Sequence, residues 1–409
     1  MAKIIFISDT HIGMNFVYNV DVRTGISQRS MDFIAAVERA VNYALENQVD
    51  AVIVCGDFYD SVLVGPTFRS IVRSRILEPL LKKEIRLIFV GGNHDAPVSL
   101  DKGSPLEDML FLPNVLIARK PTHYVLHVGS EKLGFVLLPY LAPQQAVLLL
   151  QKDIGADITH QNWHATIQQY YKKLVQQFAK EYLADCATKI LVGHYYFLGA
   201  KIRNLSSPEV LPGELEMTEE ILSPDLFDLC VLGHVHLHQS FHNRRIVLPG
   251  AIERVDIAER DDPKGFILFD TQKHDWKFVN SSPRKMIKVD ITIDESDLEP
   301  GQTIIGKIPI DVDNAIIRID VVLTTWQKQL VAFNKLDKRL EKAFSTEVVF
   351  HTQTKETETN ILRELTLDPL GLFEEFLEES AELRSHQDKD QIRQMGRQTI
   401  HEILTKGDQ

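Results

Sequence analysis

Seven side chains of types that commonly bind metal ions follow short apolar runs of the chain. Asp9 and His11 follow KIIFIS, Asp57 follows AVIVC, Asn93 follows RLIFV, His194 follows KILV, and His234 and His236 follow LCVL. Taken singly, an Asp-x-His or Gly-His pair is weak evidence, because most such pairs lie in turns or arise by chance. Five runs that all end in Asp, Asn or His, four of them after glycine, favour a shared metal site.

The elements that must position these side chains are short strands alternating with helices. The apolar runs are rich in Ile, Val, Leu and Phe and stop at Gly, Pro or Asp, which is typical of strands buried on both faces. Helical periodicity appears between them at 28–46, 67–83 and 162–184. This alternation predicts an α/β domain over residues 1–280.

The strand ends of such a domain are where ligands bind. In open α/β sheets the binding crevice lies beyond the carboxyl ends of the strands. Residues i and i+2 of an extended segment point the same way, so Asp9 with His11, and His234 with His236, should each aim two ligands at one centre. The neighbouring glycines let backbone segments approach closely.

The ligand types indicate the metal and the reaction. Two carboxylates, one amide and four imidazoles, with no thiolate, favour Mn²⁺, Fe²⁺ or Zn²⁺ over Ca²⁺ or a structural zinc site. Seven ligands are too many for one small ion and suit two, with Asp57 as the natural bridge. Two ions about 4 Å apart can hold phosphate oxygens and activate a water, so we expect phosphoester hydrolysis.

The motifs resemble a known family. SDTHIG (8–13), GDFYDS (56–61), GGNHDAP (91–97), GHYY (193–196) and GHVH (233–236) occur in the order found in calcineurin-like metallophosphoesterases. The residues within these motifs are similar to those of the branch that contains SbcD-type DNA exonuclease subunits. The resemblance covers residues 1–280. It implies a two-sheet metallophosphoesterase sandwich flanked by helices, followed by a small α+β capping domain and a helical tail.

The resemblance also implies a role for each site residue. One ion is assigned to Asp9, His11, Asp57 and His236, and the other to Asp57, Asn93, His194 and His234. His94 matches the catalytic histidine, which binds the scissile phosphate or protonates the leaving oxygen. Asp95 either orients that imidazole or is a turn carboxylate. Asp60 stands where some relatives carry a histidine.

The chain changes character near residue 280, where NSSPRK marks a boundary. We predict a nuclease domain over 1–280, a DNA-binding capping domain over 281–353, and a linker with a helical tail over 354–409. The capping domain should contain strands at 286–293, 315–324 and 346–353 and a helix at 326–344. The tail should contain helices at 369–383 and 390–406.

The resemblance implies protein partners as well. The tail helices are expected to dock on the coiled coil of an SbcC-type ATPase, which agrees with the lack of a GxxxxGK[ST] phosphate loop in this chain. Part of the 67–83 helix is expected to form a homodimer interface through the nuclease domain.

Composition bounds the class of protein. With 409 residues, 44% hydrophobic and 25% charged, the chain has the composition of a globular protein. We expect a cytoplasmic protein without a membrane segment, because no apolar run approaches about 18 residues and the three cysteines are far apart. The formal charge of −12 argues against nucleic acid, although the first 200 residues are neutral and leave room for a local basic groove.

The resemblance implies a Mn²⁺-dependent DNA nuclease subunit of an SbcCD-type repair and recombination complex. It also implies a 3′–5′ exonuclease activity on double strands and an endonuclease activity on single strands. A protein phosphatase or a phosphodiesterase for small molecules is the alternative; such phosphatases read Gly-Asp-x-x-Asp-Arg-Gly and Gly-Asn-His-Glu, whereas this chain has Asp60-Ser61-Val62 and Asp95. A non-catalytic scaffold is the third interpretation, but scaffolds lose ligands and none is missing here.

Overall fold

The computed structural model describes residues 1–95, 103–154, 163–203, 210, 214–353, 373–374, 377 and 389–406. They divide into two compact units, each described here by itself. The first comprises Met1–Lys288 with the short segments Val312–Ile317 and Ala343–Thr346. The second comprises Val289–Asp311, Arg318–Lys342 and Glu347–Gln409. The domain boundaries expected from the sequence stay predictions.

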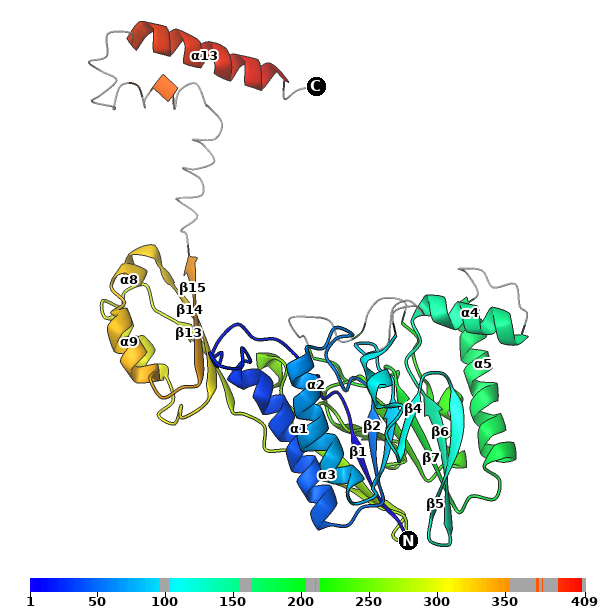
Figure 1. The fold of residues 1–409 in the computed structure, drawn as a ribbon. Helices are drawn as coiled ribbons and strands as arrows, with labels where there is room; N and C mark the ends of the chain where they lie inside the picture. The colour runs from blue at the N-terminus through cyan, green and yellow to red at the C-terminus, as the bar shows by residue number, and fades with distance from the viewer. Residues whose placement is uncertain are drawn as a thin grey trace. The chain divides into compact units, whose positions relative to one another are not determined.

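Two six-stranded sheets form the centre of the first unit (Figure 1). The first sheet has the order β12 (Asp275–Asn280), β11 (Gly265–Asp270), β1 (Lys3–Ile7), β2 (Ala51–Cys55), β3 (Arg86–Val90) and β4 (Val115–Ala118). The second has the order β5 (Thr122–Val128), β6 (Glu131–Leu138), β7 (Thr188–His194), β8 (Leu229–Gly233), β10 (Ile246–Leu248) and β9 (Gln239–Phe241). Strands β1 to β4 are parallel, as are β6, β7, β8 and β10, so their carboxyl ends meet at one edge of each sheet.

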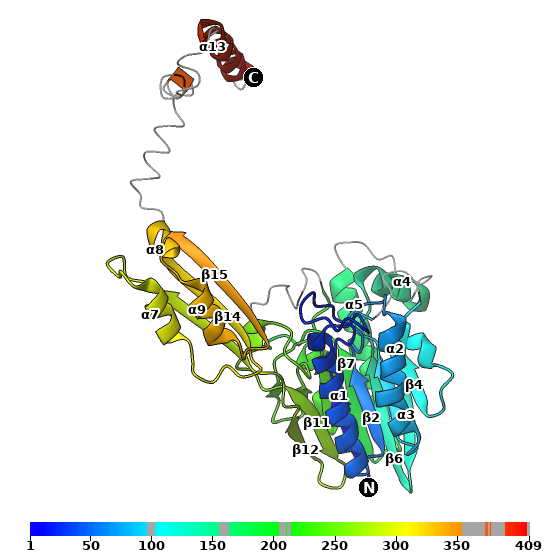
Figure 2. The same cartoon turned by 60° about the vertical axis from the view of Figure 1, so that its left-hand side comes forward.

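The outer faces of the two sheets are covered by helices (Figure 2). They are α1 (Gln28–Glu46), α2 (Pro66–Val72), α3 (Glu78–Leu81), α4 (Pro143–Ile154), α5 (Trp163–Gln177) and α6 (Glu219–Leu222). The predicted 67–83 helix is interrupted by a π-helical turn at Arg73–Leu77. Pro79 follows this turn, and its missing N–H removes one helical hydrogen bond.

Alternation along the central strands explains why both sheet faces are buried. In β1, Ile4 and Phe6 pack in the core between the two sheets, whereas Ile5 and Ile7 pack in the cluster that contains the buried face of α1. Successive side chains of a strand point to opposite faces, so a run of large apolar residues serves two cores at once. The structure is the expected sandwich of two sheets flanked by helices.

The second unit is a small α+β module. Its strands form a three-stranded sheet in the order β13 (Met286–Thr292), β14 (Ile316–Thr324) and β15 (Ser345–Gln353). Its helices are α7 (Pro300–Lys307), α8 (Thr325–Gln329) and α9 (Phe333–Leu340). Of the tail, the structure describes α13 (Lys389–Lys406), close to the predicted 390–406 helix, while most of the predicted 369–383 helix lies outside the described residues.

One prediction for this module is wrong, since the single helix at 326–344 is two helices. Gln327 and Leu336 are both buried. They are nine positions apart, so on one continuous helix of 3.6 residues per turn they would point in opposite directions. The break between α8 and α9, where Ala332 is extended, allows both side chains to be buried. Among the described helices, none is long and apolar enough to cross a membrane.

Candidate metal centre

The seven predicted ligands come together at the carboxyl ends of five strands, β1, β2, β3, β7 and β8. The first sheet supplies the three oxygen side chains and one imidazole, and the second sheet supplies three imidazoles. The first set is Asp9, His11, Asp57 and Asn93, and the second set is His194, His234 and His236. Neither sheet alone carries a complete set, so the cluster exists only because the two sheets pack face to face.

The backbone at these positions differs from our expectation. We expected extended segments, yet Asp9, His11, Asp57 and His234 all have positive φ, at 49°, 42°, 49° and 96°. Each lies just past the last residue of its strand. Left-handed backbone is unfavourable for residues with a Cβ, and its clustering is typical of functional sites. The chain therefore turns sharply after β1, β2 and β8, so the i, i+2 alternation of an extended segment does not apply there.

Two glycines make room for the ligands. A Cβ on Gly56 would lie 1.9 Å from Nδ1 of His194, and one on Gly92 would lie 2.1 Å from Oδ1 of Asp57. Both distances are far inside van der Waals contact. Only glycine allows the strand ends to pack this closely against those ligand side chains.

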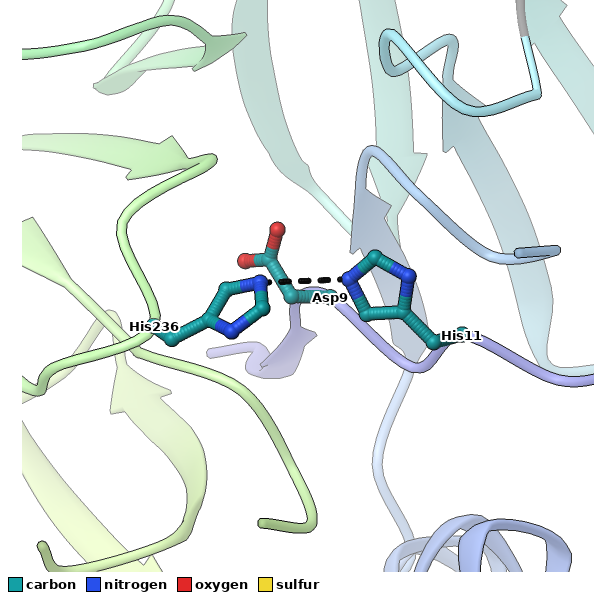
Figure 3. A group of neighbouring side chains, drawn as sticks. All are labelled: Asp9, His11 and His236. Atoms are coloured by element: carbon teal, nitrogen blue, oxygen red, sulfur yellow. Dashed lines mark hydrogen bonds between the residues drawn. The ribbon is translucent and has the colours of Figure 1, made fainter. Parts of the chain in front are cut away.

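The rings of His11, from the first sheet, and His236, from the second, meet edge-on with one nitrogen of each ring pointing at the other, beside Asp9 (Figure 3). Their Nε2 atoms are 3.2 Å apart. Nδ1 of His11 donates to Oδ1 of Asp60 at 3.1 Å, and Nδ1 of His236 donates to Oε1 of Glu259 at 2.9 Å. Because the Nδ1 atoms hold the protons, the Nε2 lone pairs point at one another. That arrangement is favourable around a cation or a shared proton.

The same pattern recurs at a second point, around the side-chain oxygen of Asn93. Nε2 of His194 lies 2.9 Å and Nδ1 of His234 lies 3.0 Å from Asn93 Oδ1. The other ring nitrogens donate elsewhere, His194 to the carbonyl of Cys55 at 2.8 Å and His234 to Glu214 at 3.1 Å. When His194 gives up its Nε2 proton, electron pairs again converge on one place, so the donor set fits a pair of divalent cations.

Asp57 and His194 stabilise each other's charged forms. Burial raises the pKa of Asp57, but the His194 imidazole, with Nε2 3.2 Å from Oδ2, lowers that pKa well below its usual range. Burial lowers the pKa of His194, but the Asp57 carboxylate raises it to about 10. An imidazole binds a metal only without this proton, so a cation at Asp57 competes with the proton of His194.

Among the residues that the structure describes, side chains of compatible type form three groups whose ligand atoms lie within 4.8 Å of one another. They are Asp9, His11 and His236; His11, Asp57 and His94; and Asp9, Asp57 and His194. Asp57 belongs to two groups, as a bridging ligand would, and so do Asp9 and His11. The geometry therefore does not distinguish Asp57 from Asp9 as the bridge.

The sequence did not reveal the groups that hold the imidazoles. Glu214 and Glu259 are buried and each accepts a hydrogen bond from one histidine of the loop after β8. Buried Lys264 lies 3.1 Å from Glu259 and donates to the carbonyl of His236 at 2.9 Å. Burial raises the pKa of Glu259, but the charges of Lys264 and His236 outweigh burial and lower this pKa to about 2. Ligand histidines commonly donate to such carboxylates, but no spacing signal marks these partners.

His94 and Asp95 occupy different surroundings. The His94 side chain is 43% exposed, its Nδ1 donates to the Asp60 carbonyl at 2.9 Å, and its backbone N–H donates to Asp57 Oδ1 at 2.8 Å. Asp95 is buried and accepts from the backbone N–H groups of Gly92 at 2.7 Å and Phe58 at 2.8 Å. Of the two interpretations of Asp95, the structure favours the turn carboxylate, and the group that orients His94 is the Asp60 carbonyl.

This chain is similar to several known proteins. A relative is the SbcD subunit of the SbcCD nuclease of Staphylococcus saprophyticus, 25% identical over 247 residues that cover 59% of this chain and 61% of the relative. The chain thus spans less than two thirds of that relative's length. Two solved structures are TT1561 of Thermus thermophilus, at 16% identity, and a dimetal phosphatase from Danio rerio, at 10%. The match to TT1561 has a TM-score of 0.37 and covers 68% of this chain and 99% of TT1561. The match to the Danio rerio phosphatase has a TM-score of 0.32 and covers 65% of this chain and 91% of that protein.

The SbcD-type resemblance inferred from the motifs is confirmed by the S. saprophyticus relative. Residues 2–238 match the model of the calcineurin-like phosphoesterase family. That span contains every predicted ligand and the parallel strands of both sheets that carry them. The chain therefore belongs to the calcineurin-like phosphoesterases, a family of metal-dependent phosphoester hydrolases.

Proposed function

We propose that this protein is a DNA nuclease that uses two divalent metal ions, with Mn²⁺ as the first candidate and Fe²⁺ or Zn²⁺ as alternatives. The observation that carries the proposal is the convergence of paired ring nitrogens at two points, one of them at the Asn93 oxygen, with the carboxylates of Asp9 and Asp57 in the same cluster. The similarity to an SbcCD nuclease subunit supports DNA as the substrate. The ligands are those predicted from the sequence: Asp9, His11, Asp57 and His236 for one ion, and Asp57, Asn93, His194 and His234 for the other.

Bound ions would supply Lewis-acid stabilisation of the phosphate and a water of lowered pKa. The chain's own residues do the rest. Asp60 and Glu259 hold the rings of His11 and His236 with Nε2 turned inward. His94 lies at the exposed edge of the cluster, with its Nδ1–H held by the Asp60 carbonyl, so its Nε2 is free to contact a scissile phosphate or carry a proton to the leaving oxygen.

The assembly is part of the proposal. We propose an SbcC-type coiled-coil ATPase as partner of the C-terminal helices, of which α13 is described, and a homodimer formed through the nuclease domain. The alternative function is hydrolysis of a small or non-DNA phosphodiester at the same centre. The relative's name, a nuclease subunit, favours a nucleic acid over this alternative.

The experiment is cleavage of end-labelled single- and double-stranded DNA in Mn²⁺, with bis(p-nitrophenyl) phosphate assayed in parallel. The native protein should cleave DNA and hydrolyse bis(p-nitrophenyl) phosphate. The His94→Ala variant should cleave DNA roughly 10²–10⁴-fold more slowly while binding metal normally. Turnover of the chromogenic ester without any DNA cleavage would support the alternative function. Failure to hydrolyse either substrate, despite bound metal, would overturn both.

A further inference from the structure

A cavity of about 280 Å³ lies next to the candidate metal centre, at the same carboxyl edge of the sheets. Its wall is mainly apolar: Leu106 and Ile117 line one side, and Leu148 and Leu149 of α4 line another. Leu148 is 55% exposed. The volume is at the lower limit of small-molecule pockets, roughly 300–1,000 Å³, and suits a single flat ring system.

Two residues join this cavity to the metal centre. Gly91 lines the cavity and precedes Gly92, the residue that packs against Asp57. Tyr140 lines the cavity, and its ring lies nearly parallel to the ring of His234, with the two ring centroids 6.5 Å apart. The Tyr140 hydroxyl donates to Glu214 at 3.2 Å, the carboxylate that holds His234. A molecule in the cavity would therefore touch the same tyrosine that supports a proposed ligand.

Cations line the rim of this cavity on an otherwise acidic chain. Arg119, Lys120 and Lys152 come from the end of β4 and the end of α4. Arg119 is paired with Glu107 at 2.8 Å. Lys120 and Lys152 are exposed, and among the described residues neither has an anionic partner. This is a local basic surface beside a phosphoester site.

We propose that the cavity is a nucleobase subsite for single-stranded DNA. One unstacked base enters it against Tyr140 and the leucines, Lys120 and Lys152 contact the flanking phosphates, and the next phosphodiester reaches the metal centre. Apolar and aromatic contact to the base combined with cations along the backbone is how proteins bind single strands without sequence preference. The inference rests on the proposed nuclease function, because it takes DNA to be the substrate.

The first test measures binding of a fluorescent single-stranded oligonucleotide in Ca²⁺. Lys120→Glu with Lys152→Glu should lower affinity at least ten-fold and reduce the slope of log affinity against log salt by about 1.4, the value for two lost contacts on a single strand. The matched control is Lys82→Glu with Lys83→Glu, the same charge change on exposed lysines in the turn before β3, at the opposite end of that strand. The control should bind like the native protein.

The second test examines the base itself. An abasic oligonucleotide should bind roughly five- to a hundred-fold more weakly than the normal one, the range for one stacked base. Leu149→Trp, which fills the cavity, should remove this discrimination while leaving the melting temperature and the metal content near native values.

The outcomes separate this subsite from the nuclease proposal. If DNA is cleaved but the lysine variants bind like the native protein and abasic DNA binds equally well, the subsite is overturned and the nuclease stands. If the native protein neither binds nor cleaves DNA yet hydrolyses bis(p-nitrophenyl) phosphate, the nuclease and the subsite are overturned together.

Discussion

The two sheets contribute to the metal centre in different ways. The first sheet supplies Asp9, Asp57 and Asn93, and the two carboxylates accept hydrogen bonds from backbone N–H groups, Asp9 from His234 and Asp57 from His94. The second sheet supplies only imidazoles, each held at its other nitrogen by a separate acceptor. The two carboxylates are thus held by backbone amides, and the imidazoles by side chains and a carbonyl from other segments.

This difference follows from the chemistry of the ligands. A carboxylate has two equivalent oxygens and needs only a fixed position, which neighbouring amides provide. An imidazole binds a metal through one nitrogen and must keep its proton on the other, so a partner has to select the tautomer. His11, the imidazole that the first sheet supplies, is held in the same way as those of the second sheet, since its Nδ1 donates to the Asp60 carboxylate.

The largest effect should come from a first-sheet oxygen that several neighbours share. Asp57→Asn removes the negative charge that two of the three ligand groups contain. Since removing an outer partner of a ligand already costs 10–100-fold, we expect losing this carboxylate to abolish binding of at least one ion and to lower turnover by more than about a hundred-fold. Metal content by atomic emission and turnover of bis(p-nitrophenyl) phosphate measure both effects. Full metal content in the variant would contradict the shared role.

An intermediate effect should come from the support of a second-sheet imidazole. Glu259→Gln leaves the ammonium of Lys264 buried without its carboxylate and frees the tautomer of His236. We expect a loss of about 3 kcal/mol in the free energy of unfolding and a 10–100-fold weaker metal affinity. Urea unfolding and calorimetric metal titration separate the two. A variant as stable as the native protein would show that Lys264 does not depend on Glu259.

The smallest effect should come from the corresponding support in the first sheet. Asp60→Asn removes the charge that faces His11, but the Asp60 side chain is 25% exposed and the backbone carbonyl that orients His94 remains. We expect about ten-fold weaker metal affinity with less than about 0.5 kcal/mol change in unfolding free energy. Urea unfolding and calorimetric metal titration measure the two effects here as well. A stability loss equal to that of Glu259→Gln would remove the distinction between the two supports.

Much of the fold could be predicted from the chain. Residues 28–46 form α1 within the predicted limits, because apolar positions at helical spacing have one face to bury. Runs such as KIIFIS become central strands with both faces covered. The β strands at 122–128 and 275–280 escaped prediction, since they are partly exposed sheet edges whose sequences lack a long apolar run.

The sequence by itself determined which residues are available as ligands and that they follow buried strands, since residue type and apolar periodicity are properties of the local chain. The tertiary structure alone decided the left-handed turns at Asp9 and His234, the pairing of His234 with Glu214 and of His236 with Glu259, and the cavity beside Tyr140. The reason is physical: these contacts join residues from separate loops and from two sheets, and they form only when burial of the apolar faces brings those segments together.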